Sequence, residues 1–287
     1  MATDTVIRGC ATPPVFQLIS RKKTLSTPKT NRDSSKDPGA LFSIPLRKIH
    51  ATCAVIAGGS FISCVLISLL FDFETATTTS CQVQNYMPSI SASTSLVPEQ
   101  YIWRTSIGLT IGYHYLFIIL NYKFFSENFN VQQTTLYQAF VKCSALVGFM
   151  ETNGLVGLTF ITSSEDHPSH HKCFVVFMSC AITNMLMYVV VIQWAHEWQP
   201  LRGKMLKTYI QKRNAFVFNA TTFAFAYYFF IRHHTYCEPG VYSLFALCEY
   251  LVVLSNIYSH LIDSLYIFND SEFYISYPGG RADVKDK

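Results

Sequence analysis

The chain has 287 residues and a formal net charge of +4, with 22 Lys and Arg residues against 18 Asp and Glu residues. Charged residues make up 14% of the chain and aromatic residues 15%, and the mean hydropathy is +0.23. Soluble domains carry roughly 25% charged residues, so a soluble globule of this composition would lack a polar surface. Abundant, clustered apolar residues without a Gly or heptad period also exclude a disordered chain, collagen and a coiled coil. The class of protein that fits this composition is a multispanning membrane protein.

Residues 1–48 are polar, carry nine Lys or Arg residues and contain several Pro turns but no apolar helical stripe. Such a segment cannot bury enough apolar surface to offset the entropy of ordering it. We therefore expect a disordered cytosolic tail. No apolar core follows the first methionine, so a cleaved secretory signal is not predicted. Residues 269–287 are expected to form a second, C-terminal cytosolic tail.

Six apolar stretches follow within residues 49–268. Each is close to the ~20 residues that a helix needs to cross a hydrocarbon core of about 30 Å. Backbone amides in lipid must be paired within their own segment, so these stretches are predicted to be helices. We expect an all-α polytopic membrane protein, a bundle of six transmembrane helices, with spans at 49–71, 103–125, 136–161, 173–194, 214–231 and 241–268.

The basic residues predict the orientation of the spans, because Lys and Arg are retained on the cytosolic side. The N-terminal tail holds nine of them, the 196–213 loop five and the C-terminal tail three, whereas the 72–102 loop holds none. With six spans, both termini and the loops at 126–135 and 196–213 lie in the cytosol. The loops at 72–102, 162–172 and 232–240 then face the lumen.

Charged side chains inside a bilayer are expensive and are functional candidates by default. Glu151 lies near the middle of the third span, Glu249 lies about a third of the way into the sixth, and Arg104 lies at the lumenal end of the second. Two interpretations of Glu151 stay open. Its carboxyl fixes helix packing beside Asn184, or it lines a polar pocket that receives a lipid headgroup.

Other polar residues lie near the predicted cytosolic ends of the spans, and we do not assign them to a functional site. Lys142 and Asp263 are expected to extend to the membrane surface. Basic and apolar residues alternate in the 196–213 loop, so this loop is predicted to lie on the anionic cytosolic leaflet. The Gly108-xxx-Gly112 spacing is only a weak indicator of a close helix contact, because it is common in apolar segments.

Two predicted lumenal loops contain most of the remaining polar chemistry. One carries Ser-Ser-Glu-Asp at 163–166, and the other carries Arg-His-His-Thr-Tyr-Cys-Glu at 232–238. A histidine held by a carboxylate can deprotonate a hydroxyl that attacks an acyl carbonyl, and Arg can hold a phosphate. Two solvated loops remain the simpler interpretation, since short polar loops are usually rich in such residues.

No metal, cofactor or nucleic acid is predicted. His167, His170 and His171 form a cluster in the sequence, but no metal-ligand spacing accompanies them. No phosphate-binding Gly-rich loop, nucleophile elbow or nucleic-acid motif is present in the sequence.

The positions of two cysteines indicate a disulfide bond. Cys81 and Cys237 both fall in predicted lumenal loops, where the environment is oxidising. We predict that they pair and tie the long first loop to the short last one; free thiols are the alternative. The cysteines within the spans are expected to be small apolar core residues.

Four separated motifs carry a resemblance to a known family: NYMPSIS at 85–91, YIWR at 101–104, TSSED at 162–166 and RHHTYCEPGVY at 232–242. These stretches resemble the family of post-GPI-attachment-to-proteins factor 2. The similarity continues through Glu249 and Tyr250 to His260 and covers about residues 45–270. The N-terminal tail lies outside it.

The resemblance implies a multi-pass protein of the Golgi membrane, and also of the endoplasmic reticulum membrane, that acts in fatty-acid remodelling of GPI anchors. Family members are needed when lyso-GPI is reacylated at sn-2 with a saturated chain. The implied partners are GPI-anchored proteins, the lyso-GPI lipid, membrane lipids and an acyl donor, either a lipid or acyl-CoA. The chain is then the acyltransferase itself or a non-catalytic lipid-binding partner of the remodelling enzymes. A membrane transporter, which needs a continuous polar path, is the third possibility.

The resemblance and the lumenal location together give expected roles for a catalyst. His233 would be the general base, and Asp166 or Glu165 would orient it. Arg232 or Arg104 would hold the phosphate of the headgroup. The complete set of substrate-binding candidates is Arg232, Arg104, Glu151, Glu238 and Glu249.

Overall fold

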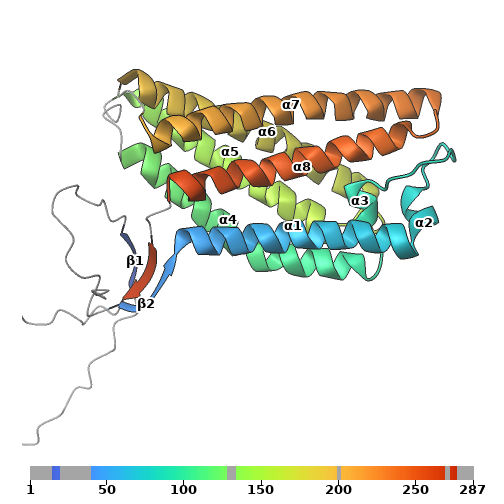
Figure 1. The fold of residues 1–287 in the computed structure, drawn as a ribbon, viewed down its shortest axis with the longest axis horizontal. Helices are drawn as coiled ribbons and strands as arrows, with labels where there is room; N and C mark the ends of the chain where they lie inside the picture. The colour runs from blue at the N-terminus through green and yellow to red at the C-terminus, as the bar shows by residue number, and fades with distance from the viewer. Residues whose placement is uncertain (1–14, 20–39, 128–133, 199–201, 269–271, 277–287) are drawn as a thin grey trace, which may run out of the picture. The chain divides into compact units, whose positions relative to one another are not determined.

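The computed structural model describes residues 15–19, 40–127, 134–198, 202–268 and 272–276 (Figure 1). The chain divides into two units, which are described separately. One unit comprises residues 1–49 and 268–287, and the other comprises residues 50–267.

The larger unit consists of long helices that run alongside one another (Figure 1). Consecutive helices from α4 to α8 pack as neighbours, and two short helices, α2 (Phe73–Thr77) and α3 (Ile90–Ser93), follow the first long helix. The long helices are α1 (Leu46–Phe71), α4 (Glu99–Glu127), α5 (Thr135–Phe160), α6 (His167–Trp198), α7 (Lys204–Tyr236) and α8 (Val241–Tyr266).

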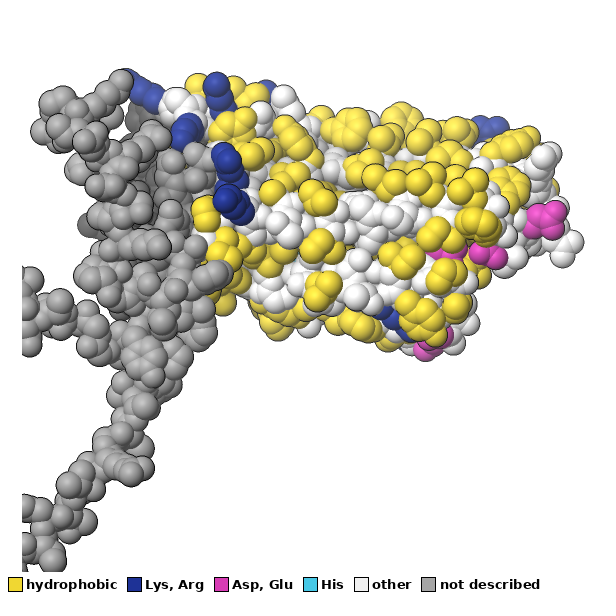
Figure 2. Space-filling model, turned by 60° about the horizontal axis from the view of Figure 1, so that its bottom comes forward, with side chains coloured by type: hydrophobic (Ala, Val, Ile, Leu, Met, Phe, Trp, Pro, Cys, Tyr) yellow, Lys and Arg dark blue, Asp and Glu magenta, His cyan; other side chains and the backbone are white. Residues whose placement is uncertain are grey.

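Four of the long helices, α1, α6, α7 and α8, are long and apolar enough to cross a membrane. Large apolar side chains are exposed along their flanks, and Figure 2 shows hydrophobic side chains over much of the visible face of the helical unit. A surface of this kind is stable against lipid and unfavourable in water. The all-α, multi-pass membrane architecture predicted from the sequence is therefore confirmed.

The helices extend beyond the predicted spans. The fifth span was predicted to begin at 214, but α7 begins at Lys204, so most of the basic run predicted as a surface loop forms the first turns of this helix. Similarly, α6 begins at His167 and α7 continues to Tyr236, so much of the two predicted lumenal loops is helical. The apolar length of a segment predicts only the part of the helix that lies in the hydrocarbon core. The helical backbone hydrogen bonds continue into the polar residues on either side, so the helices are longer than the predicted spans.

The other unit contains a three-stranded antiparallel sheet with strand order β1-β3-β2. Its strands are β1 (Val15–Ile19), β2 (Ala40–Pro45) and β3 (Glu272–Ser276). β1 and β2 lie in the segment predicted as a disordered tail, and β3 lies in the predicted C-terminal cytosolic tail. The rest of the predicted N-terminal tail through residue 39, residues 269–271 and residues 277–287 lie outside the described residues. β3, near the C-terminus, pairs with β1 and β2, near the N-terminus. Because the partners are far apart in the sequence, no local pattern predicts these strands.

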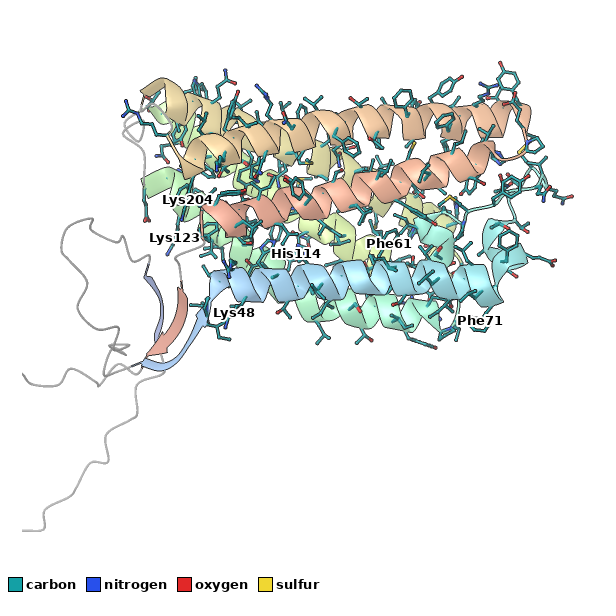
Figure 3. The ribbon with its side chains drawn as sticks, viewed as in Figure 1. Lys48, Phe61, Phe71, His114, Lys123 and Lys204 are labelled. Atoms are coloured by element: carbon teal, nitrogen blue, oxygen red, sulfur yellow. A yellow bond between two sulfur atoms is a disulfide. The ribbon has the colours of Figure 1, made fainter. Side chains whose placement is uncertain are left out.

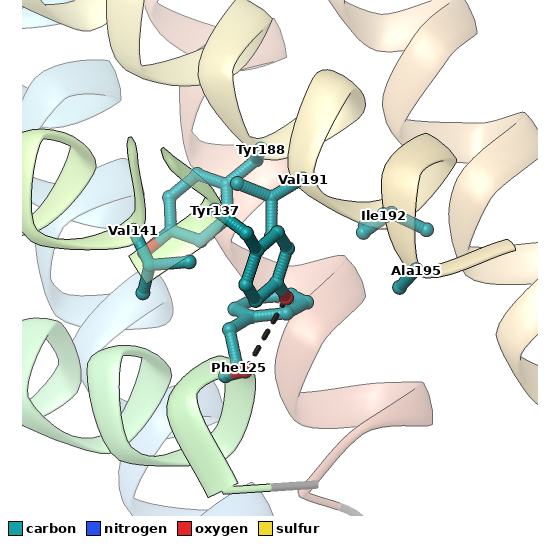
Figure 4. Close-up of a cluster of buried hydrophobic side chains, with 7 residues drawn as sticks. All are labelled: Phe125, Tyr137, Val141, Tyr188, Val191, Ile192 and Ala195. Atoms are coloured by element: carbon teal, nitrogen blue, oxygen red, sulfur yellow. Dashed lines mark hydrogen bonds between the residues drawn. The ribbon is translucent and has the colours of Figure 1, made fainter. Parts of the chain in front are cut away.

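Apolar clusters of buried side chains lie in the interior of the helical unit, and two of them are described here. Figure 4 shows the first, in which the hydroxyl of Tyr137 on α5 donates to the carbonyl oxygen of Phe125 on α4 at 3.3 Å. Tyr188 on α6 packs against both helices here. The second cluster joins Phe61 of α1 to Trp103 of α4 and to α8. Apolar contacts therefore connect α1 to the rest of the unit.

Candidate functional site

The two ends of the helical unit differ in charge. Figure 2 shows Lys and Arg side chains gathered mostly at one end and Asp and Glu side chains at the other. Lys123 and Lys204 lie at the first, which we call the basic end, and Phe71 lies at the opposite, acidic end (Figure 3). The segment 72–98 and the connections between α5 and α6 and between α7 and α8 belong to the acidic end.

A disulfide bond fastens the 72–98 segment to α7. Cys81 and Cys237 are bonded, with their Cα atoms 5.3 Å apart, which confirms the predicted pairing. Cys237 ends α7 in a left-handed conformation with φ of 49°. Close to the bond, the hydroxyl of Ser243 on α8 accepts a hydrogen bond from the Tyr86 N–H at 2.7 Å. The segment is therefore held by both covalent and polar contacts.

We expect a mobility difference between the reduced and unreduced protein on denaturing electrophoresis, because the bond joins residues 156 positions apart. Cys81→Ser and Cys237→Ser should each abolish this difference to the same extent. Cys143→Ser, which replaces an exposed free cysteine on α5, is the control that should leave the difference unchanged. A difference that persists in either of the first two variants contradicts the pairing.

Contacts from α8 hold the middle of the 72–98 segment. Glu249 is 8% exposed, and its Oε2 accepts a hydrogen bond from the backbone N–H of Ile90, the first residue of α3, at 3.2 Å. The hydroxyl of Tyr250 donates to the carbonyl oxygen of Pro88 at 2.5 Å. Glu249, a predicted substrate-binding residue, therefore has a structural partner in α3.

Contacts from the α5–α6 connection and from the first turn of α6 hold the end of the same segment. Ser91 Oγ lies 2.9 Å from Nε2 of His170, and the hydroxyl of Ser164 donates to the carbonyl oxygen of Ser95 at 3.1 Å. The 72–98 segment therefore contacts both predicted lumenal loops. Within the described residues, no hydrogen bond or ion pair joins 162–172 directly to 232–240.

His233, the predicted general base, is fully buried near the end of α7. Its Nε2 lies 3.0 Å from the hydroxyl oxygen of Thr79, and its ring packs 5.0 Å from the ring of Tyr242. Across the described part of the chain, no carboxylate forms a hydrogen bond with this imidazole, and Nδ1 has no partner. The predicted contact of His233 with Glu165 or Asp166 is not formed.

Both predicted orienting carboxylates have other partners. Glu165 forms an ion pair with Arg104 of α4 and accepts hydrogen bonds from the N–H of Thr162 at 3.2 Å and its hydroxyl at 3.0 Å. The Thr162 hydrogen bonds, followed by the Arg104 guanidinium, lower the pKa of Glu165 below its usual value. Asp166 accepts a hydrogen bond from the Ser169 N–H at 3.2 Å and caps the first turn of α6. These contacts explain why neither carboxylate reaches His233.

Arg232 forms a two-pronged ion pair with Glu238. Its Nε lies 2.6 Å from Oε2 and its Nη2 lies 3.0 Å from Oε1. Hydrogen bonding and charge from the guanidinium lower the pKa of Glu238. Tyr228, one turn earlier on α7, accepts a further hydrogen bond from Arg232 at 3.0 Å.

A cavity of about 110 Å³ lies inside the helical unit. Most of its wall is apolar, but every long helix contributes at least one polar side chain to it. Six of these polar residues are His50 of α1, His114 of α4, Glu151 of α5, Asn184 of α6, and Asn256 and His260 of α8. His114, one of the residues that line the cavity, is labelled in Figure 3.

Glu151 is one of the polar residues that line the cavity, and it is 6% exposed. Its Oε2 accepts a hydrogen bond from the Asn184 side-chain amide at 2.8 Å, and its Oε1 accepts one from Asn256 at 3.4 Å. Oε1 also lies 3.6 Å from Nε2 of His260. Glu151 therefore joins α5 to α6 and α8 and also lines the cavity, while a lipid headgroup in this cavity stays a prediction.

Two further histidines, His114 and His50, line the same cavity as Glu151 and His260. The ring centroid of His114 lies 6.3 Å from that of His260, and Nδ1 of His50 lies 2.9 Å from the Tyr113 hydroxyl. Sequence reasoning missed all three histidines as site residues, because a search for formal charge inside spans passes over a neutral imidazole. A histidine inside each of three predicted apolar spans is the signal that could have identified them.

The predicted surface positions of Asp263 and Lys212 are wrong. Asp263 Oδ2 lies 2.9 Å from Lys212 Nζ, and their side chains are 0% and 3% exposed. Lys212 Nζ also donates to the carbonyl oxygen of Ser259 at 3.2 Å and lies 4.7 Å from the ring centroid of Tyr188. The cause is the early start of α7, which places Lys212 on the helix face that packs against α8.

Fold and site together define a multi-pass, all-α membrane protein with a largely apolar cavity between its helices, into which several polar side chains project. Residues 47–265 match the family model described as Frag1/DRAM/Sfk1/Cwh43P N-terminal domain. The chain belongs to the family of post-GPI attachment to proteins factor 2.

Several relatives of that name or a related one are similar over most of their length. The chain is 36% identical over 231 residues to "Post-GPI attachment to proteins factor 2" of Caenorhabditis elegans, covering 77% of this chain and 84% of the relative. It is 33% identical over 234 residues to the Drosophila melanogaster protein of the same name, covering 78% and 87%. It is 33% identical over 244 residues to "Acyltransferase PGAP2" of Xenopus tropicalis, covering 84% and 95%. No solved protein structure matches the chain.

Proposed function

We propose that the chain remodels the fatty acids of GPI anchors and reacylates lyso-GPI at sn-2 with a saturated chain, as an acyltransferase of the Golgi membrane. The names of the relatives support this proposal, because they refer to GPI attachment and, in the Xenopus tropicalis protein, to acyl transfer. The aligned region also contains the cavity and the residues of the acidic end. The acyl donor in this proposal is a membrane lipid or acyl-CoA.

The observation that carries the proposal is a pair of partly exposed guanidinium groups at the acidic end. The Arg104 side chain is 21% exposed and that of Arg232 is 41% exposed, and their partners Glu165 and Glu238 are 50% and 39% exposed. Solvent-exposed ion pairs contribute only about 0–1 kcal/mol, so an anionic ligand can replace the carboxylates. Arg binds phosphate through two parallel N–H donors. We assign the phosphoinositol headgroup to these two residues.

We also propose six spans, α1 and α4 to α8, with both termini and the polar tails in the cytosol. The lengths of α4 and α5, 29 and 26 residues, support this number because ~20 residues span a bilayer. Lys123 of α4 and Lys204 of α7, which lie at the basic end, support the orientation, since Lys and Arg favour the cytosolic side. The disulfide at the acidic end is consistent with an oxidising lumen on that side.

The proposal gives no proton-transfer role to the acidic-end residues predicted as catalytic. In the structure, the hydroxyl of Thr79 lies beside His233 Nε2, so the 72–98 segment would have to move before a substrate could reach it. Glu165 and Asp166 stabilise Arg104 and the first turn of α6 instead.

The test is rescue in cells that lack their own member of the family. We expect the wild-type chain to restore a saturated sn-2 chain on surface GPI anchors, measured by mass spectrometry of the released lipid. Arg104→Gln and Arg232→Gln should each lower the restored fraction roughly tenfold, because a hydrogen bond to a charged group contributes about 1.5–3 kcal/mol. Lys142→Gln, at an exposed site on α5, is the matched control.

Two carboxylate variants separate lipid binding from folding. Glu165→Gln and Glu238→Gln free the guanidinium groups, so rescue should be retained although each ion pair is lost. Equal loss of rescue in the arginine and carboxylate variants would mean that the pairs act only in folding. Failure of the well-expressed wild-type chain to change the sn-2 composition contradicts the proposed function.

A further inference from the structure

We propose that the exposed face at the acidic end of α7 binds the glycan of the GPI anchor, and that a sugar ring stacks on the aromatic ring of Tyr236. This inference rests on the proposed function and extends its headgroup site, because Arg232 is one of the two arginines assigned to the phosphoinositol group. The ligand is therefore a phosphoinositol glycolipid that is recognised by its sugars as well as by its phosphate.

The helix α7 has a buried face and an exposed face, and it runs along one edge of the helical unit in Figure 1. Side chains three or four residues apart lie on the same face of a helix. One row at this spacing is buried and consists of Lys212, Ala215, Asn219, Thr222, Ala226 and His233. A second row at the same spacing is exposed or partly exposed and consists of Phe218, Phe225, Tyr228, Arg232 and Tyr236.

The order of side chains along the exposed row matches the order of the parts of a membrane-anchored glycolipid. The helix α7 is long and apolar enough to cross a membrane, and it ends with Tyr236 at the acidic end. Phe218 and Phe225 lie within the span predicted at 214–231, and Arg232 follows it directly. Tyr236 lies one turn, about 6 Å, further along the helix axis. A lipid beside this row would place its chains against the two Phe rings, its phosphate at Arg232 and its sugars at Tyr236.

The guanidinium of Arg232 is held in position on this face. Its Nη1 donates to the hydroxyl oxygen of Tyr228 at 3.0 Å, and Glu238 accepts hydrogen bonds from its Nε and Nη2. Side chains four residues apart are neighbours on a helix surface, so Tyr236 lies next to Arg232 on the side away from Tyr228. A phosphate that replaces Glu238 at this guanidinium therefore brings the groups attached to it to Tyr236.

The ring of Tyr236 is available for a ligand. Its side chain is 70% exposed, and among the described residues it makes no hydrogen bond and no ring contact. The face of an aromatic ring carries a partial negative charge. The C–H groups on one side of a sugar ring carry a weak positive charge, so this side packs flat against an aromatic face. Tyr236 therefore presents the kind of surface that a pyranose ring requires.

The connection between α7 and α8 adds a second exposed aromatic ring. Tyr86 is 56% exposed, and its nearest ring atom lies 3.5 Å from the position of a Cβ on Gly240. The Tyr86 N–H donates to the Ser243 hydroxyl, which fixes the backbone at this position. Glu238 lies between Tyr236 and Gly240 in the sequence, and its carboxylate can accept hydrogen bonds from sugar hydroxyls. The same connection therefore offers an acceptor and a second stacking surface.

A membrane-interface role is the alternative explanation for exposed tyrosines at the end of a span, because Tyr is enriched where the bilayer meets water. The two roles make different demands on the side chain. A membrane contact needs apolar bulk and affects every lipid in the same way. A glycan contact needs a flat ring and affects only a lipid that carries sugars.

The experiment measures dissociation constants of the purified full chain in phosphatidylcholine nanodiscs. The two probes are lyso-GPI and lysophosphatidylinositol, which has the phosphoinositol group and one chain but no glycan. We expect the wild type to bind lyso-GPI about tenfold more tightly, as expected for aromatic contacts with the glycan. Tyr236→Leu should lower the affinity for lyso-GPI about fivefold and leave that for lysophosphatidylinositol unchanged, whereas Tyr236→Phe keeps the ring and should retain both affinities.

Three further variants complete the comparison. Tyr86→Leu should weaken the binding of lyso-GPI alone, whereas Arg232→Gln should weaken both lipids because both carry the phosphate. Tyr227→Leu, at a tyrosine that is 62% exposed on a different face of α7, is the matched control and should change neither affinity. Unchanged binding of lysophosphatidylinositol also shows that a tyrosine variant is folded.

Loss of lyso-GPI affinity in Tyr236→Leu with unchanged binding of lysophosphatidylinositol supports the inference. Equal affinity of the wild type for the two lipids overturns the glycan surface and leaves the proposed function intact. Equal weakening of both lipids in Tyr236→Leu assigns the ring to the membrane interface and also overturns the inference. A wild-type protein that binds neither lipid overturns the inference together with the proposed headgroup site.

Discussion

Asp263→Ala should lower the free energy of unfolding by about 3–5 kcal/mol, the usual effect of removing one partner from a buried ion pair. The substitution leaves the Lys212 ammonium, which is 3% exposed, without its carboxylate between α7 and α8. Lys212→Met should have a similar effect, because the Asp263 carboxylate is fully buried and its Oδ1 has no partner within the described residues. The loss is measured as a lower denaturation midpoint in detergent.

The double variant Lys212→Met with Asp263→Leu provides the control. Replacing both charges removes the unpaired buried group, and apolar residues of similar volume are often neutral or stabilising at such a site. We expect the double variant to regain most of the stability that either single variant loses. A double variant as unstable as the sum of the two single variants contradicts the assigned pairing.

Gly154→Ala should destabilise the protein by about 1–3 kcal/mol through overpacking of α5 against α6. A Cβ atom on Gly154 would lie 2.8 Å from the backbone nitrogen of Phe177 and 2.9 Å from its Cα. Backbone atoms in the middle of a helix cannot move aside as a flexible side chain can, so the two helices must separate. Small residues permit this kind of close approach between helices in membranes.

Gly112→Ala is the matched control, because no atom lies within 4 Å of the corresponding Cβ position on α4. Alanine has a higher helix propensity than glycine by about 0.8–1.0 kcal/mol, so this variant should be neutral or more stable. Thermal unfolding in detergent measures both variants. Destabilisation of equal size in the two variants would mean that the α5–α6 contact is not the cause.

The sequence predicts the main features of the helical unit because they follow from local composition. Apolar length locates the helices, and the positions of Cys81 and Cys237 in the two predicted lumenal loops indicate the disulfide bond that the structure contains. The close helix contact is less predictable. Gly108-xxx-Gly112 has the spacing associated with such contacts, yet among the glycines a Cβ would be crowded to under 3 Å by α6 at Gly154 and Gly157 of α5. Spacing does not tell which helix face meets a neighbour.

The candidate site is predictable only in part, for the same reason. The charge of Glu151 inside an apolar span marks it as a site residue, but its partners Asn184 and His260 come from helices that meet only in the fold. At the acidic end, the residue types indicate acid–base chemistry, but in the structure Glu165 forms an ion pair with Arg104 instead of contacting His233. Which side chains contact one another depends on how the helices pack in three dimensions, so these contacts cannot be predicted from the sequence alone.

The most direct measurement of the central claim is the mass of the lipid formed when purified wild-type protein, without other proteins, is incubated with lyso-GPI and a deuterated saturated acyl donor. We expect a GPI lipid that carries the deuterated chain at sn-2, formed over many turnovers per protein molecule. Unchanged lyso-GPI with either donor, from protein that restores remodelling in cells, would contradict an acyltransferase and assign the chain a non-catalytic role.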